Sequence, residues 1–420
     1  MNRAGTSGNS ANWVPIAAPA DLTAVAIYAL EAATLSSRDP AVDLQHDTEQ
    51  IILRDSAEKF LAERYDYRTF QRIADKAGWS PELWAEFAAL GWLGLPFSVD
   101  DGGSGGGAVE LAILMEAFGR HLVIEPYLAT VVLGGGLVAS LGSAAERRAI
   151  LPAVMEGKCR LAFAHDDRGA PARAQRRSDG YLVQGDKKVV LGGPMADTLL
   201  VSAELASGKT GVFVLPNDTR GLTVRSLRMV DGSRAADVAL ADVTVPSSAL
   251  LGSNEDAGDA VEAVLQRAIA ALSADAAGAI ATMVKTTVDY LKTRVQFGQP
   301  LAKFQALQHR LVAIKIREEE ARAAALFATL SLDGAADVRA RAISGAKAKI
   351  GRCARTVHQE AIQLHGAIGT TNELALGGYA KRLIAYEILF GSTREHLKRY
   401  GEIIANPDIA SQGLLIAARN

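Results

Sequence analysis

The sequence predicts an α+β protein of several domains: an N-terminal helical domain, a middle antiparallel β-domain and a C-terminal four-helix bundle. Three observations predict this order. Apolar residues first recur with helical spacing, short β-branched runs follow, and long segments rich in Ala, Leu, Arg, Lys and Glu complete the chain. We expect an N-terminal extension followed by three domains, which cover residues 1–43, 44–158, 159–253 and 254–420.

Composition is that of an ordinary globular protein. The 420 residues carry a net charge of −2, with 22% charged and 49% hydrophobic residues, enough for a large core. Near-neutral charge gives no electrostatic basis for binding nucleic acid or an anionic membrane. The two cysteines, Cys159 and Cys353, lie far apart and match no metal-binding spacing. We therefore expect no metal and a reduced, cytoplasmic compartment.

The N-terminal domain begins with helical patterns, one of which starts at Ser80-Pro81 as N-cap and first helical residue. The stretch from Pro126 to Ala145 carries no charge, but its glycines and serines dilute its apolar character. It predicts a buried core helix rather than a membrane span. The Gly-rich runs 102–107 and 134–136 follow no strand and lack Gly-Lys-Ser/Thr, which favours loops or close helix packing over phosphate binding.

The β-domain is predicted from five short runs bounded by Ser-Asp-Gly, Pro-Asn-Asp and Asp-Gly-Ser turns. No helical pattern separates them, which indicates an antiparallel sheet folded as a small sandwich or barrel. The runs begin, in order, at Tyr181, Thr198, Gly211, Leu222 and Ala236.

Two segments of the C-terminal domain carry unusual polar residues. The segment from Arg294 to His309 joins two helical patterns and contains Arg, Lys, His and four Gln in sixteen residues. Unpaired polar groups are costly in a buried connection, so we expect this segment to bind a polar ligand. The second segment starts at Gln363, and its Gly366 and Gly369 allow close approach of the backbone to a ligand. Alone, it is more typical of a helix C-cap and turn.

Together these motifs resemble the acyl-CoA dehydrogenase family over about residues 44–404. Arg-x-Gln-Phe-Gly-x-Pro-Leu-x-x-Phe-Gln from Arg294 and Gln-x-His-Gly-x-x-Gly from Gln363 precede Arg382, which lies nine residues before Gly391. The segments 116–136 and 230–238 are similar to the branch that contains the small subunit of pimeloyl-CoA dehydrogenase.

The resemblance implies FAD bound between the sheet and the bundle, with the acyl thioester against the flavin. A carboxylate would remove the α-proton while the β-hydrogen leaves as hydride. It also implies a dimer or tetramer, with a paralogous subunit as one option, and a flavoprotein electron acceptor. In such an oligomer the C-terminal motifs reach the FAD of a neighbouring subunit. The expected cofactor-binding residues are Arg294, Gln296, Phe297, Phe304, Gln308, Gln363, Gly366 and Gly369, with Ala164 and Val189 in the β-domain.

The sequence departs from the family at the catalytic base. The two positions that carry Glu in the family are occupied here by Ala268 and Gly391, and neither residue can accept a proton. Asp275 is the expected substitute, since seven residues return it to the same helix face, about 10 Å further along. Glu387 is the alternative. For both acids, a solvated or capping role is the competing interpretation.

The expected flavin pocket departs as well. Ala164–Gly169 replaces Thr-Glu-Pro-x-x-Gly-Ser-Asp, and Val189-Val190-Leu191 replaces Trp-x-Thr, so side-chain donors are missing while backbone N–H groups remain. His165 either substitutes for a lost donor or, as we favour, lies in a surface loop.

Three functions are consistent with these motifs. The first is an FAD-dependent dehydrogenase, or a subunit of one, for a dicarboxylyl-CoA or a bulky, steroid-type acyl-CoA. The second is a catalytically silent subunit that completes the FAD site of a partner chain. The third is a flavin monooxygenase on the same fold.

Overall fold

The computed structural model describes residues 45–371 and 373–405. The expected N-terminal extension therefore lies outside the described residues. The chain divides into two compact units, residues 1–51 and 52–420, and the second unit contains the sheet and the helical bundle.

The N-terminal part is helical, as the sequence predicts. Ser80 caps the helix that starts at Pro81, its hydroxyl accepting from the N–H of Leu83 at 3.4 Å, so the predicted start is confirmed. The expected core helix is also confirmed, although its first part is a π-helix. The helices are α2 (Thr48–Arg64), α3 (Tyr67–Asp75), α4 (Pro81–Ala89), α5 (Ala108–His121), the π-helix η3 (Leu128–Gly135), α6 (Gly136–Leu141) and α7 (Ala144–Met155).

Close packing explains the glycines of the π-helix. A Cβ on Gly134 would lie 2.4 Å from the Cβ of Leu161, and one on Gly135 would lie 2.4 Å from the ring of Phe97. Contacts this short would force neighbouring atoms to shift. The interpretation of this run as a helix-packing element, and not a phosphate loop, fits the structure.

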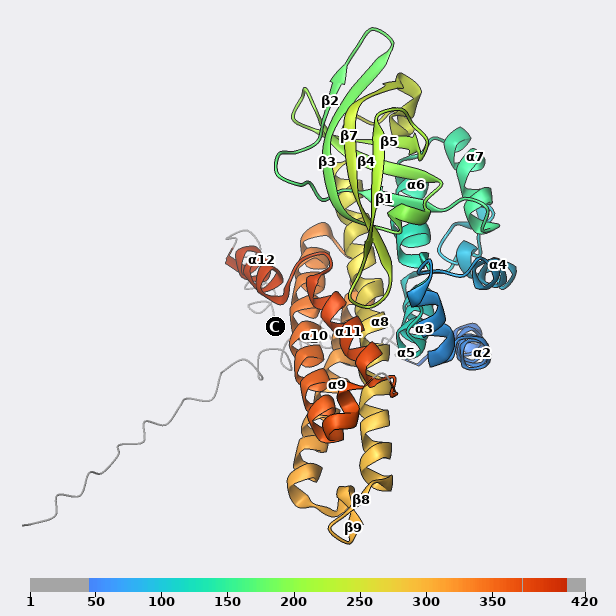
Figure 1. Cartoon of the computed structure of the whole chain (residues 1–420). Coiled ribbons are helices and arrows are strands. Elements are labelled where there is room, and N and C mark those ends of the chain that lie inside the picture. The colour runs from blue at the N-terminus through green and yellow to red at the C-terminus, as the bar shows by residue number, and fades with distance from the viewer. Residues whose placement is uncertain (1–44, 372, 406–420) are drawn as a thin grey trace, which may run out of the picture. The chain divides into compact units, whose positions relative to one another are not determined.

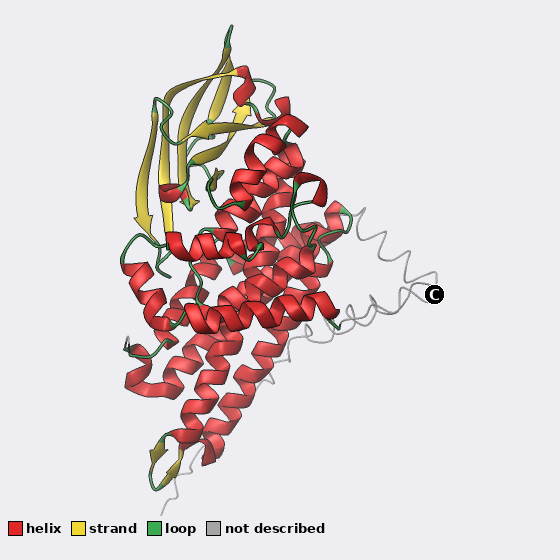
Figure 2. Ribbon diagram, turned by 90° about the vertical axis from the view of Figure 1, so that its right-hand side faces the viewer, coloured by secondary structure: helices red, strands yellow, loops and turns green. Residues whose placement is uncertain are grey.

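The middle part is one seven-stranded sheet that curls at one end of the helices (Figure 2). Its strands follow the order β1-β4-β2-β3-β7-β6, with β5 paired to β4. A bulge interrupts the pairing of β3 and β7 between Lys187 and Val190. The strands are β1 (Leu161–Ala164), β2 (Arg173–Arg176), β3 (Gly180–Leu191), β4 (Thr198–Leu205), β5 (Thr210–Pro216), β6 (Leu222–Arg228) and β7 (Arg234–Pro246).

The prediction of a purely antiparallel sheet is wrong for two pairings. Strand β4 runs parallel to both β1 and β2, with Leu161 opposite Thr198 and Arg173 opposite Glu204. The β2–β3 hairpin lies between β1 and β4 in the chain, so β4 re-enters the sheet in the direction of β1. Sequence spacing does not reveal this order, because it shows only that no helix separates the runs.

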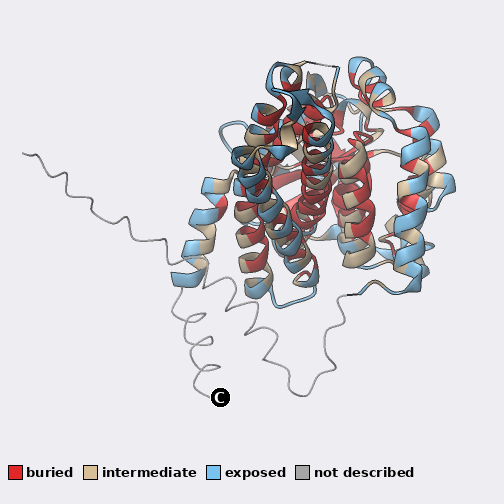
Figure 3. Ribbon diagram, turned by 90° about the horizontal axis from the view of Figure 1, so that it is seen from below, coloured by how far each residue is buried: buried red, intermediate tan, exposed pale blue. Residues whose placement is uncertain are grey.

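The C-terminal part is a helical bundle, as predicted, whose buried faces meet along α8 (Figure 3). Helix α8 is the one described helix that is long and apolar enough to cross a membrane, but 83% of its apolar window is buried inside the protein, as in a core helix. The elements are α8 (Gly258–Thr293), β8 (Val295–Gln296), β9 (Gln299–Pro300), α9 (Gln305–Leu330), α10 (Ala336–His365), α11 (Leu376–Ile388) and α12 (Thr393–Ala405).

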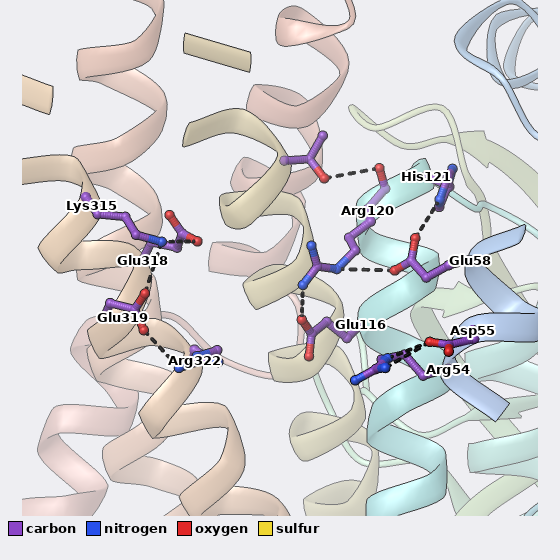
Figure 4. Close-up of polar contacts among 11 residues, drawn as sticks. Arg54, Asp55, Glu58, Glu116, Arg120, His121, Lys315, Glu318, Glu319 and Arg322 are labelled. Carbon is purple, nitrogen blue, oxygen red and sulfur yellow. Dashed lines mark hydrogen bonds and ion pairs between the residues drawn. The ribbon is translucent and has the colours of Figure 1, made fainter. Parts of the chain in front are cut away.

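Helices α5 and α8 touch backbone to backbone. A Cβ on Gly119 would lie 1.8 Å from the carbonyl oxygen of Asp275, and one on Gly278 would lie 2.1 Å from that of Glu116. Beside this contact, the Arg120 guanidinium is paired with Glu58 and Glu116 (Figure 4). This contact therefore fixes the distance between α5 and α8.

Figure 4 also shows a row of charges on α9, in which Lys315, Glu319 and Arg322 are exposed and Glu318 is partly buried. Lys315 pairs with Glu318 and Glu319, and Arg322 pairs with Glu319. Exposed pairs of this spacing stabilise a helix only weakly, so the row keeps this face solvated and is not part of the site.

Candidate functional site

Arg382 on α11 joins the three parts of the protein. Its Nε and Nη2 donate to the two carboxylate oxygens of Asp275 on α8, at 2.9 and 2.7 Å. Its Nη1 donates to Asp231 in the β6–β7 turn at 2.8 Å, and Nη2 also donates to the carbonyl of Val123 after α5 at 2.9 Å. The Arg382 guanidinium therefore links the bundle, the sheet and the N-terminal helices by hydrogen bonds.

This cluster is almost entirely desolvated. The side chains of Asp275, Asp231 and Arg382 are 1%, 4% and 13% exposed. Burial by itself lowers the pKa of Arg382, but Asp275 and Asp231 hold it above its usual value. Burial raises the pKa of Asp275, and Arg382 opposes that rise. Breaking such a buried pair leaves an uncompensated charge, which is strongly destabilising.

The structure gives Asp275 a partner that sequence analysis did not foresee. Both of its oxygens accept from Arg382 and its side chain is 1% exposed, so a ligand has little access to this carboxylate. Its assignment as catalytic base stays a prediction, and these contacts argue for a structural role. Ala268, at one family position of the base, is fully buried on the same helix.

Glu387 acts as a cap in this structure. Its carboxylate accepts from the N–H and the hydroxyl of Thr393, at 3.1 and 2.6 Å, where α12 begins. Gly391, at the other family position, has φ +100°, and a Cβ there would approach Nε2 of His396 to 3.1 Å. An L-residue at this position would be strained, so the usual glutamate does not suit the local backbone.

A small cavity of about 70 Å³ lies beside the Arg382 cluster. It adjoins the end of β3, the segment after α5, and helices α8 and α11. Its apolar walls include Met115, Phe118, Leu128, Leu191, Leu272 and Leu389. By its location, between the sheet and the bundle, it is the place where the resemblance puts the acyl group.

Glu125, one of the residues around this cavity, was missed by sequence analysis. It is 6% exposed, and neither carboxylate oxygen accepts a hydrogen bond of normal geometry from the described residues. Burial raises its pKa to about 7, with the Tyr65 hydroxyl opposing the rise. A glutamate within the apolar run after α5 was the available signal.

The β-domain candidates differ in exposure. Ala164 is fully buried in the core of the sheet, so neither its backbone nor its side chain is open to a ligand in this structure. Val189 lies at the bulge of β3, is 36% exposed and has φ +52°. His165 lies in the loop after β1, as favoured, and it is partly exposed. Its Nδ1 lies 3.0 Å from the Ser202 hydroxyl, and its ring stacks on Phe163.

The candidates of the Arg294 segment lie on the hairpin that ends α8. Arg294, Gln296 and Phe297 are all exposed, and Phe297 is 88% exposed. Its ring meets Phe304 edge to face at 6.1 Å, while Gln308 donates to the carbonyl of Ala302 at 2.8 Å. Within the described residues, no ion pair neutralises the Arg294 guanidinium, so it is available to an anion from outside this chain.

The Gln363 segment lies at the same end of α8. The ring of His365 stacks on Tyr290 at 4.4 Å, four residues before Arg294. Gln363 is exposed, and Gly366 has φ +66° with open space where a Cβ would point. Gly369 differs: a Cβ there would lie 2.9 Å from the Cβ of His365, so packing within the chain explains this glycine.

The predicted cofactor residues therefore form two groups, one beside the sheet and the other at the C-terminal end of α8 (Figure 1). Leu272 stands at the level of the cavity and of β3, and Arg294 begins the hairpin. The 22 residues between them correspond to about 33 Å of helix. At this distance the two groups would hold different parts of a cofactor, and we call them the two candidate half-sites.

Six described non-glycine residues have a strained backbone. Positive φ occurs at Leu122, Val189, Asp242, Ser253, Phe297 and Phe390. Val189 and Phe297, with φ of 52° and 55°, are predicted cofactor residues, and Phe390 precedes Gly391. Such conformations cost about 1–3 kcal/mol each and concentrate at functional sites. With the open Gly366 and the unpaired Arg294, they fit a large anionic cofactor, while the β-domain offers it only backbone donors.

Comparison with known proteins finds matches to one protein family. The model of the acyl-CoA dehydrogenase N-terminal domain matches residues 47–158, and that of the acyl-CoA dehydrogenase C-terminal domain matches residues 259–404. The acyl-CoA dehydrogenase FadE12 of Mycobacterium tuberculosis is 29% identical over 345 residues, which cover 77% of this chain and 88% of that protein.

Two solved structures are similar along most of their length. A variant of the Tcur3481–Tcur3483 steroid ACAD is 30% identical, with a TM-score of 0.77 over 85% of this chain and 98% of that one. The ChsE4–ChsE5 complex of Mycobacterium tuberculosis is 24% identical, with a TM-score of 0.81 over 87% of this chain and 99% of that one, and shares the fold.

Proposed function

The chain belongs to the acyl-CoA dehydrogenase family, and from this premise we propose that it works as one subunit of an FAD-dependent oligomer that desaturates an acyl-CoA between Cα and Cβ. The observation that carries the proposal is the separation of the two half-sites along α8. A second subunit, placed with its own hairpin against this β-domain, would bring complementary halves together.

In this arrangement each half-site has a separate task. Arg294, Gln296 and the open backbone at Gly366 would hold the cofactor of the neighbouring subunit, since a guanidinium fork suits a pyrophosphate. The bulge of β3 at Val189 would present backbone groups to the cofactor of this chain. When bound, FAD would accept the β-hydrogen as hydride.

The partner is proposed to be a second, paralogous chain that supplies the catalytic carboxylate. The two family positions of the base hold Ala268 and Gly391, and Asp275 is occupied by Arg382. The Tcur3481–Tcur3483 steroid ACAD and the ChsE4–ChsE5 complex are each named after two components. Oligomers with more than one kind of chain therefore occur among structures with this fold.

We further propose a dicarboxylyl or bulky, steroid-type acyl group as substrate, a flavoprotein as electron acceptor and the cytoplasm as location. A catalytically silent role, in which the chain only completes the partner's FAD site, is the second candidate. The paired state of Asp275 favours it.

The deciding experiment measures FAD per chain in the protein purified alone and after co-expression with the neighbouring reading frame. We expect little FAD in the protein purified alone, stoichiometric FAD in the complex, and anaerobic bleaching of the complex by an acyl-CoA. A fully loaded homomer that an acyl-CoA bleaches would contradict the heteromer. A loaded complex that acyl-CoAs never bleach would contradict dehydrogenation.

A further inference from the structure

A second, larger cavity adjoins the small one. It has a volume of about 480 Å³ and lies between the α3–α4 connection and the sheet. Met195 and Arg234 line both cavities, so they form a shared wall. We call the small one the inner cavity and the large one the outer cleft. The polar and aromatic residues of the outer cleft are Lys76, Trp79, Arg160, Asp197, Asn217, Ser226 and Arg234.

The outer cleft is cationic. Of the described residues around it, Lys76, Arg160 and Arg234 carry positive charge, and Asp197 carries the opposing negative charge. Asp197 is already engaged, since Nε and Nη2 of Arg160 donate to its two oxygens at 3.0 and 2.8 Å. Two of the three positive charges therefore have no acidic partner in the cleft.

Arg234 is held there without a counter-charge. Its guanidinium donates to the main-chain carbonyls of Ala74, Lys76 and Gly232, at 2.9, 2.6 and 2.7 Å. No carboxylate of the described residues lies within ion-pair distance of it. Burial lowers the pKa of Arg234, a sign that its charge is partly desolvated. A cation fixed by neutral carbonyls stays attractive to an incoming anion.

The remaining walls are rigid. The Arg160 guanidinium lies over the ring of Trp79, 4.4 Å from its centroid, so its pairing with Asp197 is reinforced by a cation–π contact. Lys76 is exposed and forms no ion pair within the part of the chain that the structure describes. The cleft thus combines the unpaired Arg234 guanidinium and the exposed Lys76 ammonium with an Arg160 guanidinium that Asp197 already neutralises, and its net positive charge suits a carboxylate.

We propose that the outer cleft binds a carboxylate at the far end of the acyl group, whose apolar part passes along the inner cavity. The inner cavity, at about 70 Å³, is much smaller than the outer cleft, at about 480 Å³, so a longer chain would continue past Met195. This inference rests on the proposed function and assigns its distal specificity to Lys76, Arg160 and Arg234. The phosphates of coenzyme A share the same anionic chemistry and are the competing occupant.

The test compares binding of three compounds to the full-length chain in its FAD-loaded complex: a dicarboxylyl-CoA, the monoacyl-CoA of equal chain length, and free coenzyme A. Lys76→Gln removes the mobile charge, and Lys59→Gln removes an equally exposed lysine of α2 that does not line the cleft. We expect Lys76→Gln to weaken the binding of the dicarboxylyl-CoA by about tenfold, as expected for the loss of one charge-assisted contact. The other two compounds and the Lys59 variant should stay within about twofold of the wild type.

A second variant tests whether Arg160 compensates for the loss of the Lys76 charge. Arg160→Gln combined with Asp197→Asn removes both members of the pair, so no lone acid remains. It should again weaken the dicarboxylyl-CoA selectively. Equal weakening of all three compounds would assign the cleft to coenzyme A phosphates and overturn the proposal, as would unchanged affinities. A wild type that binds no acyl-CoA, alone or with its partner, would overturn the proposed function and this subsite together. If the wild type is active but the variants bind all three compounds with wild-type affinity, only the proposed subsite is overturned.

Discussion

Arg382 donates hydrogen bonds to both oxygens of Asp275, with donor–acceptor distances of 2.9 and 2.7 Å. The aspartate side chain is 1% exposed. The pair joins α11 to α8, and Asp231 and the carbonyl of Val123 attach the sheet and the N-terminal helices to the same guanidinium. The aspartate that resembles a base in sequence is thus part of the joint between domains.

The first prediction separates these two roles. Asp275→Asn should lower the free energy of unfolding by about 3 kcal/mol, because one partner of a buried ion pair is removed while Asp231 still compensates part of the charge. Chemical denaturation measures this change. If Asp275 were instead the base, the variant would keep its stability and FAD content but lose anaerobic bleaching by acyl-CoA.

The contact of α5 with α8 gives the second prediction. Gly119→Ala should destabilise the protein by at least about 2 kcal/mol, since the new methyl group would meet the Asp275 carbonyl, which is backbone and cannot rotate away. Gly401→Ala is the matched control on α12, where a Cβ has open space, and it should stabilise by about 0.5–1 kcal/mol. Equal thermal stability of the two variants would contradict the prediction.

Strain at the bulge of β3 gives the third prediction. Val189→Gly should raise the free energy of unfolding by about 1 kcal/mol, because a β-branched residue at φ +52° is strained and glycine is not. Its neighbour Val190 is 1% exposed in the core of the sheet, and Val190→Gly should destabilise by more than about 2 kcal/mol. Denaturation midpoints of both variants test the contrast, and a loss of stability in Val189→Gly would refute the strain.

The exposed hairpin gives the fourth prediction. Arg294→Ala should leave the melting temperature of the cofactor-free chain unchanged within about 1 °C, since its side chain is exposed and forms no described ion pair. FAD per chain in the purified oligomer should nevertheless fall several-fold, because the pyrophosphate loses its guanidinium. Lys292→Ala, an equally exposed cation of the last turn of α8, should retain FAD. Similar FAD contents in both variants would exclude the proposed contact.

The fifth prediction concerns pH. The pKa of Glu125 is raised by burial from about 4.5 to about 7, so the folded state holds a proton that the unfolded state releases. Wild-type stability should therefore fall as pH rises from about 4.5 to about 7, by about 3 kcal/mol in total. Glu125→Gln removes this loss, and its melting temperature relative to wild type should climb between pH 5 and pH 8.

Glu116→Gln serves as its control, because Glu116 is paired with Arg120 on α5 and shows no such burial. A constant difference in melting temperature between the Glu125 variant and the wild type, at every pH, would show that the carboxyl is not protonated by burial.

Much of the fold was predictable because the signals are local. The N-cap at Ser80, the core helix after Pro126 and the long helices of the bundle each follow from neighbouring residues. The exposure of the Arg294 segment was predictable for the same reason, since that many polar groups cannot be buried without partners. Strand direction was not predictable, because the parallel position of β4 depends on strands far away in the chain.

The sequence by itself determined the family and the order of helical, sheet and helical parts, and it predicted a set of candidate cofactor residues, because periodicity, capping and motif spacing are properties of short segments. Only the tertiary structure decided what those residues can do. Asp275 became an ion-pair partner because α8 and α11 bring it to Arg382, 107 residues away. The cofactor residues separated into two half-sites because a straight helix of about 33 Å lies between them. The outer cleft exists because Lys76, Arg160 and Arg234, from three distant segments, meet where the sheet packs against the first helices.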